Sequence, residues 1–408
     1  MTSTASTGSS ETPAGSSDER GVAGEPLVSV VLPIHNGEEY LSQAIESVLG
    51  QDVERLELIV VDDASSDSSA RIARGYGDRL RYLRVPKQPT SIATTNVGMS
   101  AARGRYLCVT HQDDYLLPGK LRRHVELMER DPDIGFSYSA QWFVGPRGEP
   151  LKKLRSPLRE GDYIVAGTEE LRHLAVQNFL NYCNVVMRRT AYEAAGPFDE
   201  PLWVSADWGL WLRMALRYRV GYIDDLLVCY RLHPAAQTIA RTQDADDWRT
   251  QALAAVDAFY ATPGLPADVR SRQELTEASV DLTVGLLDAI HGRAAPAVTA
   301  LRQVVRRVGW GALPGLVHSA VIVPRAASRA RMVLDERVWH PRPAWSDGVA
   351  FERRGEVLTC PRCDAVAAYE PFLASRSRKA ASGGPVRLRC LVCGYRWERT
   401  LEANSAVG

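Results

Sequence analysis

Two hydrophobic patterns alternate along the first third of the chain. Four short apolar runs rich in β-branched residues follow one another: VSVVLPI, ELIVV, LRYLRV and RYLCVT. Runs of this length are typical of strands buried on both faces. Between the first two, apolar residues recur at helical spacing, as at Leu41, Ile45 and Val48. Because strands that alternate with helices need crossover connections, the pattern predicts an α/β domain with a mainly parallel sheet flanked by helices.

The pattern becomes less regular after Pro118. LRRHVELMERD predicts a helix and IGFSYSA a strand, while residues 144–168 are rich in Gly, Pro and charge and predict a loop or insertion. Residues 1–25 hold almost no large apolar side chain, so we expect a disordered tail. These changes divide the chain into a tail at 1–25, an α/β domain at 26–240, a helical region at 241–345 and a small domain at 346–408.

Composition excludes some partners and leaves others open. The 408 residues carry 49 basic and 49 acidic side chains, so no overall field favours nucleic acid or a membrane. No apolar run approaches the roughly 20 residues of a spanning helix, and the first residues lack signal-peptide features, so we expect a cytoplasmic protein. Residues 302–342 nevertheless hold eight arginines and two acidic residues. This segment predicts peripheral contact with an anionic membrane face, or alternatively a solvated helical face packed on the catalytic domain.

Three acidic motifs stand where an apolar run stops or an amphipathic helix starts. They are ELIVVDDASSD, HQDDY and SADWGLWLR. In an α/β sheet the carboxyl ends of the strands form the edge where ligands bind, so these carboxylates are candidate site residues. Asp62 and Asp63 could accept from a nucleobase or ribose, or serve as turn residues that cap the next helix.

In this order, over roughly residues 27–235, the motifs resemble the family 2 glycosyltransferases. The resemblance implies a GT-A fold and transfer of a sugar, with inversion, from a nucleotide-diphospho-sugar donor to an acceptor hydroxyl. The acceptor would be a glycan or lipid-linked sugar in polysaccharide or glycolipid assembly. By motif position, the resemblance implies that the following residues bind the donor: Pro33, Asn36, Asp62, Asp63, Asn96, Arg103, Asp114 and Arg231.

A divalent cation is expected at HQDD. These side chains follow a buried strand directly, and a hard cation held by one or two carboxylates neutralises a diphosphate leaving group. Asp113 is the principal candidate ligand for Mn²⁺ or Mg²⁺, with His111 and His233 as further candidates. The alternative is that the Asp-Asp pair at the end of the strand binds no metal and only makes hydrogen bonds within the turn. In the family the first position is usually Asp, so His111 either alters metal preference or hydrogen-bonds the donor.

A general base is expected at Asp207. It resembles the Asp of the family's Glu-Asp-aromatic motif, and a carboxylate in a partly desolvated pocket has the required proton affinity. The alternative is a simple N-cap, although a cap and a base are compatible. Trp203 and Trp208 could present flat faces to an acceptor sugar or belong to the core.

Three departures from the family pattern support a different class of function. His111, Thr95 and Ala206 replace the usual Asp, Arg and Glu. A catalytically silent nucleotide-sugar fold that works as a scaffold would be expected to show such changes. A nucleotidyltransferase would need a glycine-rich basic loop after the first strand, and LPIHNGEEYL is neither.

The C-terminal part carries a second metal motif. Cys360, Cys363, Cys390 and Cys393 form two C-x-x-C pairs separated by 26 residues. Four thiolates close the tetrahedral sphere of zinc, so the pattern predicts a structural Zn²⁺ in a zinc-ribbon-like domain. Redox-active dithiols, the alternative, would appear as one such pair near a βαβ pattern.

Overall fold

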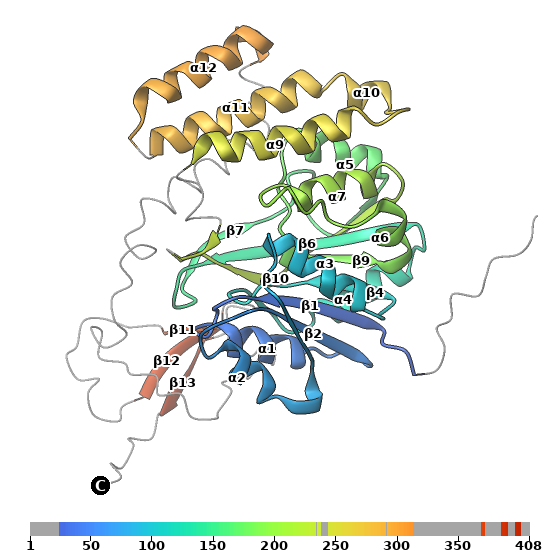
Figure 1. The fold of residues 1–408 in the computed structure, drawn as a ribbon, viewed down its shortest axis with the longest axis vertical. Coiled ribbons are helices and arrows are strands. Elements are labelled where there is room, and N and C mark those ends of the chain that lie inside the picture. The colour runs from blue at the N-terminus through green and yellow to red at the C-terminus, as the bar shows by residue number, and fades with distance from the viewer. Residues whose placement is uncertain are drawn as a thin grey trace, which may run out of the picture.

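The computed structural model describes residues 24–233, 235–237, 244–290 and 292–312, together with three short strands near the C-terminus (Figure 1). The main sheet consists of β1 Val28–Ile34, β2 Leu56–Asp63, β3 Arg81–Val85, β4 Tyr106–Val109, β5 Tyr115–Leu116, β6 Ile134–Val144, β7 Pro150–Leu154, β8 Tyr163–Val165, β9 Val185–Arg188 and β10 Arg219–Arg231. The helices are α1 Leu41–Leu49, α2 Ser69–Arg74, α3 Ser91–Ala101, α4 Lys120–Glu129, α5 Gly167–Leu174, α6 Arg189–Ala195, α7 Ala206–Ala215, α9 Ala245–Tyr260, α10 Ala267–Arg270, α11 Gln273–Ile290 and α12 Ala294–Val308. Short 3₁₀ turns lie at η1 Gly77–Arg79, η2 Tyr182–Asn184 and η3 Trp310–Ala312.

The sheet is mixed rather than mainly parallel. Its strand order is β3-β2-β1-β4-β9-β6-β10-β5, and β3, β2, β1 and β4 are parallel as predicted. Beyond β4 the strand β9 runs antiparallel to both of its neighbours, while β10 is again parallel to β6. The expected loop at 144–168 contains β7 and β8, which pair antiparallel with β6 and β10. The prediction of a mainly parallel sheet is therefore correct for the first half of the sheet and wrong for the second, where β7, β8 and β9 pair antiparallel with their neighbours.

Hydrophobic cores lie on both faces of the sheet. On β1, Val30 and Leu32 point to the face covered by α1 and α4, and Val31 points to the face covered by α3 and α7. This alternation is the two-residue period of a strand, so a strand buried on both faces must be apolar throughout. Figure 1 shows α1 and α2 below the sheet and α6 and α7 above it.

Helix α3 packs directly on the parallel strands through Gly98. A Cβ at that position would lie 2.3 Å from a methyl group of Val31 and 2.9 Å from one of Val61. Glycine therefore lets the helix approach the strands that end at the site.

The helical part 245–308 is joined to the α/β domain through α9. Ala252, Val256 and Phe259 of α9 and Val280 of α11 belong to the same core as Trp211 of α7. Figure 1 shows α9, α11 and α12 stacked beyond α7 on the side of the molecule away from α1 and α2. Within the described residues, no helix combines the length and apolar character that crossing a membrane requires.

Several predictions concern residues that the structure does not describe. The tail at 1–25 is described only from residue 24, and the basic segment 302–342 only to residue 312; Cys360, Cys363 and Cys393 lie outside the described residues. Cys390 is the last residue of β12. Near the C-terminus β11 Tyr369–Pro371, β12 Pro385–Cys390 and β13 Arg396–Thr400 form an antiparallel sheet in the order β11-β12-β13.

Candidate active site

The carboxyl ends of β1 and β2 form what we call the nucleotide edge, residues 33–37 and 62–69. Parallel pairing sets Pro33 opposite Val61 and Ile34 opposite Asp62, so the loops that follow the two strands leave the sheet together. The sheet register thus gathers the predicted Pro33, Asn36, Asp62 and Asp63 in one place.

Asp62 is fully buried, and protein donors reach both of its oxygens. Oδ1 accepts from the Ser65 amide at 2.8 Å, and Oδ2 accepts from the Tyr82 hydroxyl and from Nη1 of Arg84. Burial alone would raise the pKa of Asp62, but these hydrogen bonds and the charge of Arg84 lower it below its ordinary value. Asp62 therefore holds the turn after β2.

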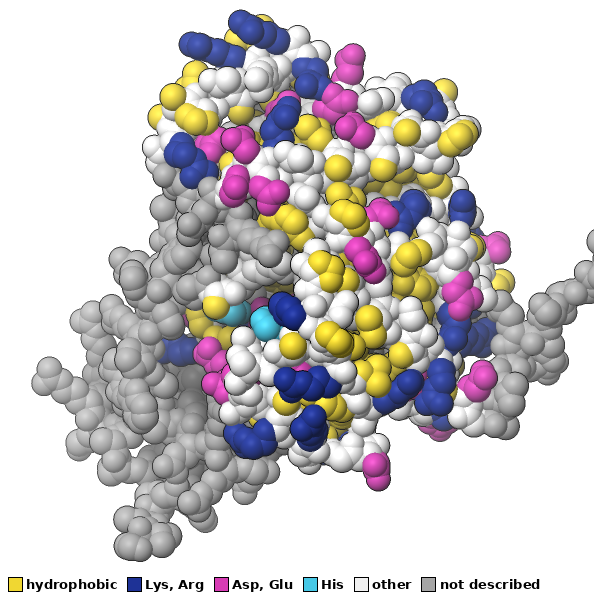
Figure 2. All heavy atoms as spheres, in the orientation of Figure 1, with side chains coloured by type: hydrophobic (Ala, Val, Ile, Leu, Met, Phe, Trp, Pro, Cys, Tyr) yellow, Lys and Arg dark blue, Asp and Glu magenta, His cyan; other side chains and the backbone are white. Residues whose placement is uncertain are grey.

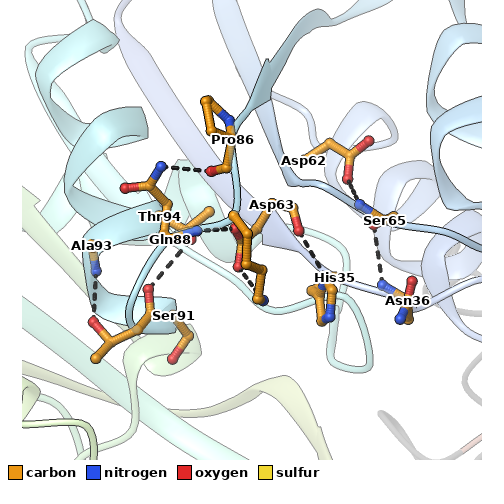
Figure 3. A network of polar contacts seen from close by, with 12 residues as sticks. His35, Asn36, Asp62, Asp63, Ser65, Pro86, Gln88, Ser91, Ala93 and Thr94 are labelled. Atoms are coloured by element: carbon orange, nitrogen blue, oxygen red, sulfur yellow. Dashed lines mark hydrogen bonds and ion pairs between the residues drawn. The ribbon is translucent and has the colours of Figure 1, made fainter.

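Asp63, the next residue of β2, points to the opposite face of the sheet from Asp62, and one of its partners is a more exposed side chain than those around Asp62. Its Oδ1 accepts from the Gln88 amide at 2.6 Å and its Oδ2 from Nζ of Lys87 at 2.7 Å, while its carbonyl lies 2.7 Å from Nδ1 of His35 (Figure 3). The Lys87 side chain is 58% exposed, so it can leave when a ligand arrives. Of the two predicted carboxylates, Asp63 is the one that a ligand could reach.

Asn36 joins the two loops. It has a φ of 50°, and its side-chain oxygen accepts from the Ser66 amide at 2.8 Å, while its own amide donates to Oγ of Ser65. Asparagine tolerates this left-handed conformation better than most residues. Ala64 in the neighbouring turn has a φ of 53° without that advantage.

The second group of candidates lies in the HQDD turn, residues 111–114, after β4. Oδ2 of Asp113 lies 3.0 Å from Nε2 of His233, and Nδ1 of His111 lies 3.6 Å from Oδ2 of Asp114. Burial alone would raise the pKa of Asp113, but the His233 hydrogen bond and the charges of His111 and His233 lower it. Burial, together with the charge of Asp113, raises the pKa of Asp114. The favoured anion of the pair is thus Asp113.

Arg231 organises this turn from behind. It is 2% exposed; its amide donates to Asp114 Oδ1 at 2.8 Å and its Nε to the Asp113 carbonyl at 2.8 Å. The other guanidinium nitrogens donate to the Pro146 carbonyl and to Oε1 of Gln43. Since all three guanidinium nitrogens bond to the protein, Arg231 positions the turn in this structure.

His111 connects the HQDD turn to Asp207. Burial alone would lower its pKa, but the hydrogen bond and charge of Asp114 and the charges of Asp113 and Asp207 raise it above the ordinary value. Its ring lies 5.3 Å from the Tyr182 ring. The HQDD turn and Asp207, which belong to two of the three acidic motifs, therefore come together at His111.

Asp207 lies in the first turn of α7, and the N-cap residue of that helix is Ser205. The N-cap alternative for Asp207 is therefore wrong. Oδ1 of Asp207 accepts from Nδ2 of Asn178 at 3.1 Å and from the Trp208 amide at 2.6 Å. Position in the first helical turn stabilises the carboxylate through the helix dipole.

A cavity of about 170 Å³ opens in front of this carboxylate; we call it the Asp207 pocket. Figure 2 shows histidine side chains at a hollow between the helical part and the sheet. The lining residues include both predicted tryptophans, two of the three departures from the family pattern, and side chains of α9 and α11. They are Ser91, Ile92, Thr95, His111, Val176, Gln177, Asn178, Asn181, Tyr182, Trp203, Val204, Ser205, Asp207, Trp208, Tyr230, Gln237, Trp248, Ser279, Val280 and Thr283.

The structure does not bring two predicted donor residues to the nucleotide edge. Arg103 bonds through Nε and Nη2 to Oε1 of Glu57, which lies near the start of β2, whereas Asp62 and Asp63 end that strand. Arg103 therefore lies at the opposite edge of the sheet, and its predicted donor contact is wrong. Asn96 donates to the Phe198 carbonyl at 2.9 Å and to Glu200 at 3.1 Å, so it anchors α3 to the 198–200 loop.

Sequence reasoning missed Gln112. Its Oε1 accepts from the His35 amide at 2.8 Å and its Nε2 donates to the His35 carbonyl at 3.0 Å, which ties the HQDD turn to the nucleotide edge. A Cβ at Gly37 would lie 2.3 Å from this side chain. The glycine after Asn36 was the available signal.

Known proteins agree with this geometry. Residues 29–193 match the model of the family named Glycosyl transferase family 2. A Bacillus subtilis protein named uncharacterized glycosyltransferase EpsJ is 32% identical over 254 residues, which cover 59% of this chain and 71% of that protein. The chain belongs to glycosyltransferase family 2. As a member it is an enzyme, so the scaffold alternative loses its main support.

Other family 2 relatives match over a similar region. An uncharacterized glycosyltransferase of Rickettsia prowazekii is 27% identical over 214 residues, which span 52% of this chain and 66% of that protein. In the Rickettsia felis relative the matched region spans 34% of the length. The match thus leaves part of each relative uncovered.

Two solved glycosyltransferases share the fold. Staphylococcus aureus TarS 1–349 in complex with UDP-GlcNAc superposes with a TM-score of 0.51 at 15% identity, covering 76% of this chain and 91% of that one. The mannosyltransferase PcManGT from Pyrobaculum calidifontis, in complex with GDP-Man and Mn²⁺, gives 0.50 at 15% identity, covering 78% and 89%. These likenesses identify the fold of this family 2 enzyme as GT-A.

The HQDD turn suits a divalent cation. Asp113 Oδ2 and His233 Nε2 converge to 3.0 Å, and a carboxylate with an imidazole is a donor set that Mn²⁺ accepts. Among the described residues, no group of three or more His, Cys, Asp or Glu could hold a metal by itself. Asp113 and His233 are the two predicted ligands that meet here, while Nδ1 of the third, His111, lies 3.6 Å from Oδ2 of Asp114. Oxygens of a bound diphosphate would fill other positions, as is usual for such sites.

Proposed function

We propose that this enzyme transfers a sugar, with inversion, from a nucleotide-diphospho-sugar donor to an acceptor hydroxyl. The observation that carries the proposal is the position of His111: it lines the same cavity as Asp207, and its Nδ1 lies 3.6 Å from Oδ2 of Asp114 in the HQDD turn. A leaving-group site and a general base within reach of one side chain are the arrangement that direct displacement needs. The nucleotide sugars bound by TarS and PcManGT support the donor class.

In the mechanism Asp207 accepts the proton of the acceptor hydroxyl as that oxygen attacks the anomeric carbon. Asn178 and the Trp208 amide orient the carboxylate through its Oδ1. Asp113 and His233 would hold a divalent cation, which would supply positive charge that stabilises the diphosphate leaving group. Asp63 accepts from the nucleobase or ribose once Lys87 moves, while Pro33 and Asn36 shape that end of the site.

Ligand binding by the full chain tests the donor assignment. Thermal unfolding would be followed with UDP, GDP and their hexose conjugates, each with Mn²⁺, with Mg²⁺ and with neither. We expect one nucleotide to raise the melting temperature in a metal-dependent way, because a ligand that binds only the folded state stabilises it. NMR of the product would then give the anomeric configuration. No response across the whole panel contradicts the donor site, and retained configuration contradicts inversion.

For the acceptor we propose a glycan or lipid-linked sugar presented at a membrane surface. Val298 and Leu301 of α12 are 47% exposed and Trp310 is 76% exposed, with exposed Arg302 and Arg306 beside them. Apolar side chains flanked by arginines fit an anionic lipid surface. Flotation with phosphatidylcholine vesicles, with and without phosphatidylglycerol, should show binding only to the anionic vesicles. Equal binding to both, or to neither, contradicts this contact.

We also propose a structural zinc bound by Cys360, Cys363, Cys390 and Cys393. The two C-x-x-C pairs support it, as does the antiparallel sheet in which Cys390 ends β12. Mass spectrometry for metals should find one zinc per chain, lost on changing Cys360 and Cys390 to Ser. A zinc-free full-length chain with an intact C-terminal part would contradict the assignment.

A further inference from the structure

The far wall of the Asp207 pocket comes from outside the region that the family model matches. That model ends at residue 193, whereas Trp248 comes from α9, and Ser279 and Thr283 come from α11. The helical part therefore does more than cover the domain, because its side chains enclose the space in front of the base.

Polar atoms in this pocket lack protein partners. Gln177 is 8% exposed, and its Oε1 has no hydrogen-bond partner among the described residues; the same holds for Nδ2 of Asn181. Both residues line the pocket. A buried polar atom left without a partner destabilises a protein, so such atoms at a pocket point to a ligand that satisfies them. Oε1 accepts and Nδ2 donates, which matches a ligand with several hydroxyl groups, since a hydroxyl group both donates and accepts.

Tryptophans contribute flat apolar walls to the same pocket. Trp203 and Trp248 are half-buried, while Trp208 is buried and donates through Nε1 to the Leu174 carbonyl at 2.7 Å. Oε1 of Gln251 on α9 accepts from the Trp203 amide at 3.1 Å, so α9 helps to place that wall. Aromatic faces pack well against the C–H face of a pyranose ring, and the polar atoms reach its hydroxyls.

Hydroxyl groups of α11 complete the arrangement. Ser279 is 1% exposed and Thr283 is 6% exposed, and the Thr283 hydroxyl donates to the Ser279 carbonyl at 2.9 Å. With its proton used in that bond, the Thr283 oxygen is left as an acceptor for a ligand hydroxyl.

We propose that α9 and α11 form the acceptor subsite, which takes the terminal hexopyranose of a saccharide acceptor, with Trp248 and Thr283 as specificity-determining residues. This inference rests on the proposed function, since Asp207 is its base. The ring sits between the tryptophan faces with one hydroxyl at Asp207 and others at Gln177 and Thr283. A lipid-linked sugar and a free glycan share this terminal ring.

The experiment uses the full chain and defined acceptor probes. The substrate would be the donor that the thermal-unfolding panel identifies. The acceptor probes would be methyl and octyl hexopyranosides that differ in ring stereochemistry, and the measured quantity would be the rate of nucleotide diphosphate release. Release without any probe reports donor hydrolysis, and 1-octanol controls for the alkyl chain. Methyl glycosides acting as well as octyl glycosides indicate a free glycan end, and a strong octyl preference indicates a lipid-linked one.

Two variants and one matched control test the wall. Trp248→Ala and Thr283→Val should each raise KM for the glycoside about tenfold, the effect of losing roughly 1.4 kcal/mol, while donor hydrolysis changes less than about twofold. Trp248→Phe, which keeps a flat face, should recover most of the affinity. Thr299→Val on α12 is the matched control. The Thr299 hydroxyl also donates to a carbonyl of its own helix, that of Ala295 at 3.0 Å, but Thr299 does not line the pocket. This variant should leave glycoside-dependent release and donor hydrolysis unchanged.

Failure of this inference is distinguishable from failure of the proposed function. If donor hydrolysis proceeds but no glycoside accelerates nucleotide release, the pocket does not take a hexopyranose and the inference is overturned. If both variants leave the glycoside KM unchanged, α9 and α11 are not part of the subsite. Loss of donor binding and hydrolysis in the wild-type chain would instead contradict the proposed function itself.

Discussion

At the nucleotide edge each carboxylate oxygen of Asp62 and Asp63 already accepts from a protein donor. In the Asp207 pocket, by contrast, Gln177 and Asn181 each carry an atom without a partner in the described part of the chain. The first region lies inside the part matched by the family model, and the second draws on α9 and α11 beyond it. A region whose polar groups are satisfied is rigid before its ligand arrives. A region with unsatisfied groups depends on its ligand for those hydrogen bonds, so the two regions differ in how completely they are organised before a ligand binds.

The largest expected effect is at the base. Asp207→Asn keeps the size and the contact with the Trp208 amide but removes the proton acceptor, so sugar transfer should fall by about 10²–10⁴-fold. Donor binding, measured by thermal shift, should stay within about twofold of wild type. Parallel loss of donor binding would show that Asp207 supports the nucleotide side and would break the division between the two regions.

The second prediction concerns the pH dependence of stability and the buried Glu170 of α5. Burial raises its pKa to about 8 despite the hydrogen bond from Tyr138, so the folded state holds a proton that the unfolded state releases near pH 4.5. The stability contributed by this proton is therefore complete below pH 4.5 and is lost as the pH rises to 8, by roughly 1.4 kcal/mol per pH unit at most. Urea unfolding between pH 5 and 8 should show this slope, and Glu170→Gln should flatten it. An unchanged slope in the variant would assign the pH dependence to other groups.

Asp113 tests the leaving-group side. Asp113→Ala should weaken metal-dependent nucleotide binding by roughly tenfold to a hundredfold, equivalent to about 1.4–2.7 kcal/mol, because the cation loses its principal protein ligand. Addition of EDTA to the wild type should produce a similar loss, and EDTA should then have little further effect on the variant. If neither Asp113→Ala nor EDTA weakens nucleotide binding, the assignment of a cation to this site is contradicted.

The smallest expected effect concerns strain at the nucleotide edge. Ala64 has a φ of 53°, which costs a non-glycine residue about 1 kcal/mol. Ala64→Gly should stabilise the protein by up to about 0.5 kcal/mol after its added chain entropy is counted, and Ala64→Val should destabilise it. Chemical denaturation measures both. A destabilised glycine variant would indicate that the alanine methyl group makes a compensating contact.

Much of the first half of the fold could be predicted because buried parallel strands produce continuous apolar runs. The same logic placed Asp62, Asp63 and Asp113 at strand ends. Arg103 could not be placed, since its partner Glu57 is known only once β2 is aligned with the start of β1. The reversal of direction at β9 has no such signal, because a four-residue strand has the same alternation in either direction.

The Asp207 pocket was largely beyond sequence reasoning. Gln177 and Asn181 lie between α5 and η2, where no period identifies which side chains face inward. Trp248 and Thr283 belong to helices whose apolar spacing predicts packing but not the neighbouring pocket. Only contacts between distant parts of the chain reveal them, such as the hydrogen bond from the Trp203 amide, before α7, to Gln251 of α9.

The contacts of Arg231 have a consequence for the order in which the enzyme is made. Its guanidinium joins Gln43 of α1 to the HQDD turn, a link across 188 residues, and His233 follows two positions later. On the ribosome the nucleotide edge emerges long before these residues, and domains generally fold as units during synthesis. A nascent chain that stops before β10 therefore carries the nucleotide edge but lacks Arg231 and His233, which complete the proposed leaving-group site. Under the proposed function, the growing polypeptide stays inactive until its catalytic domain is nearly finished.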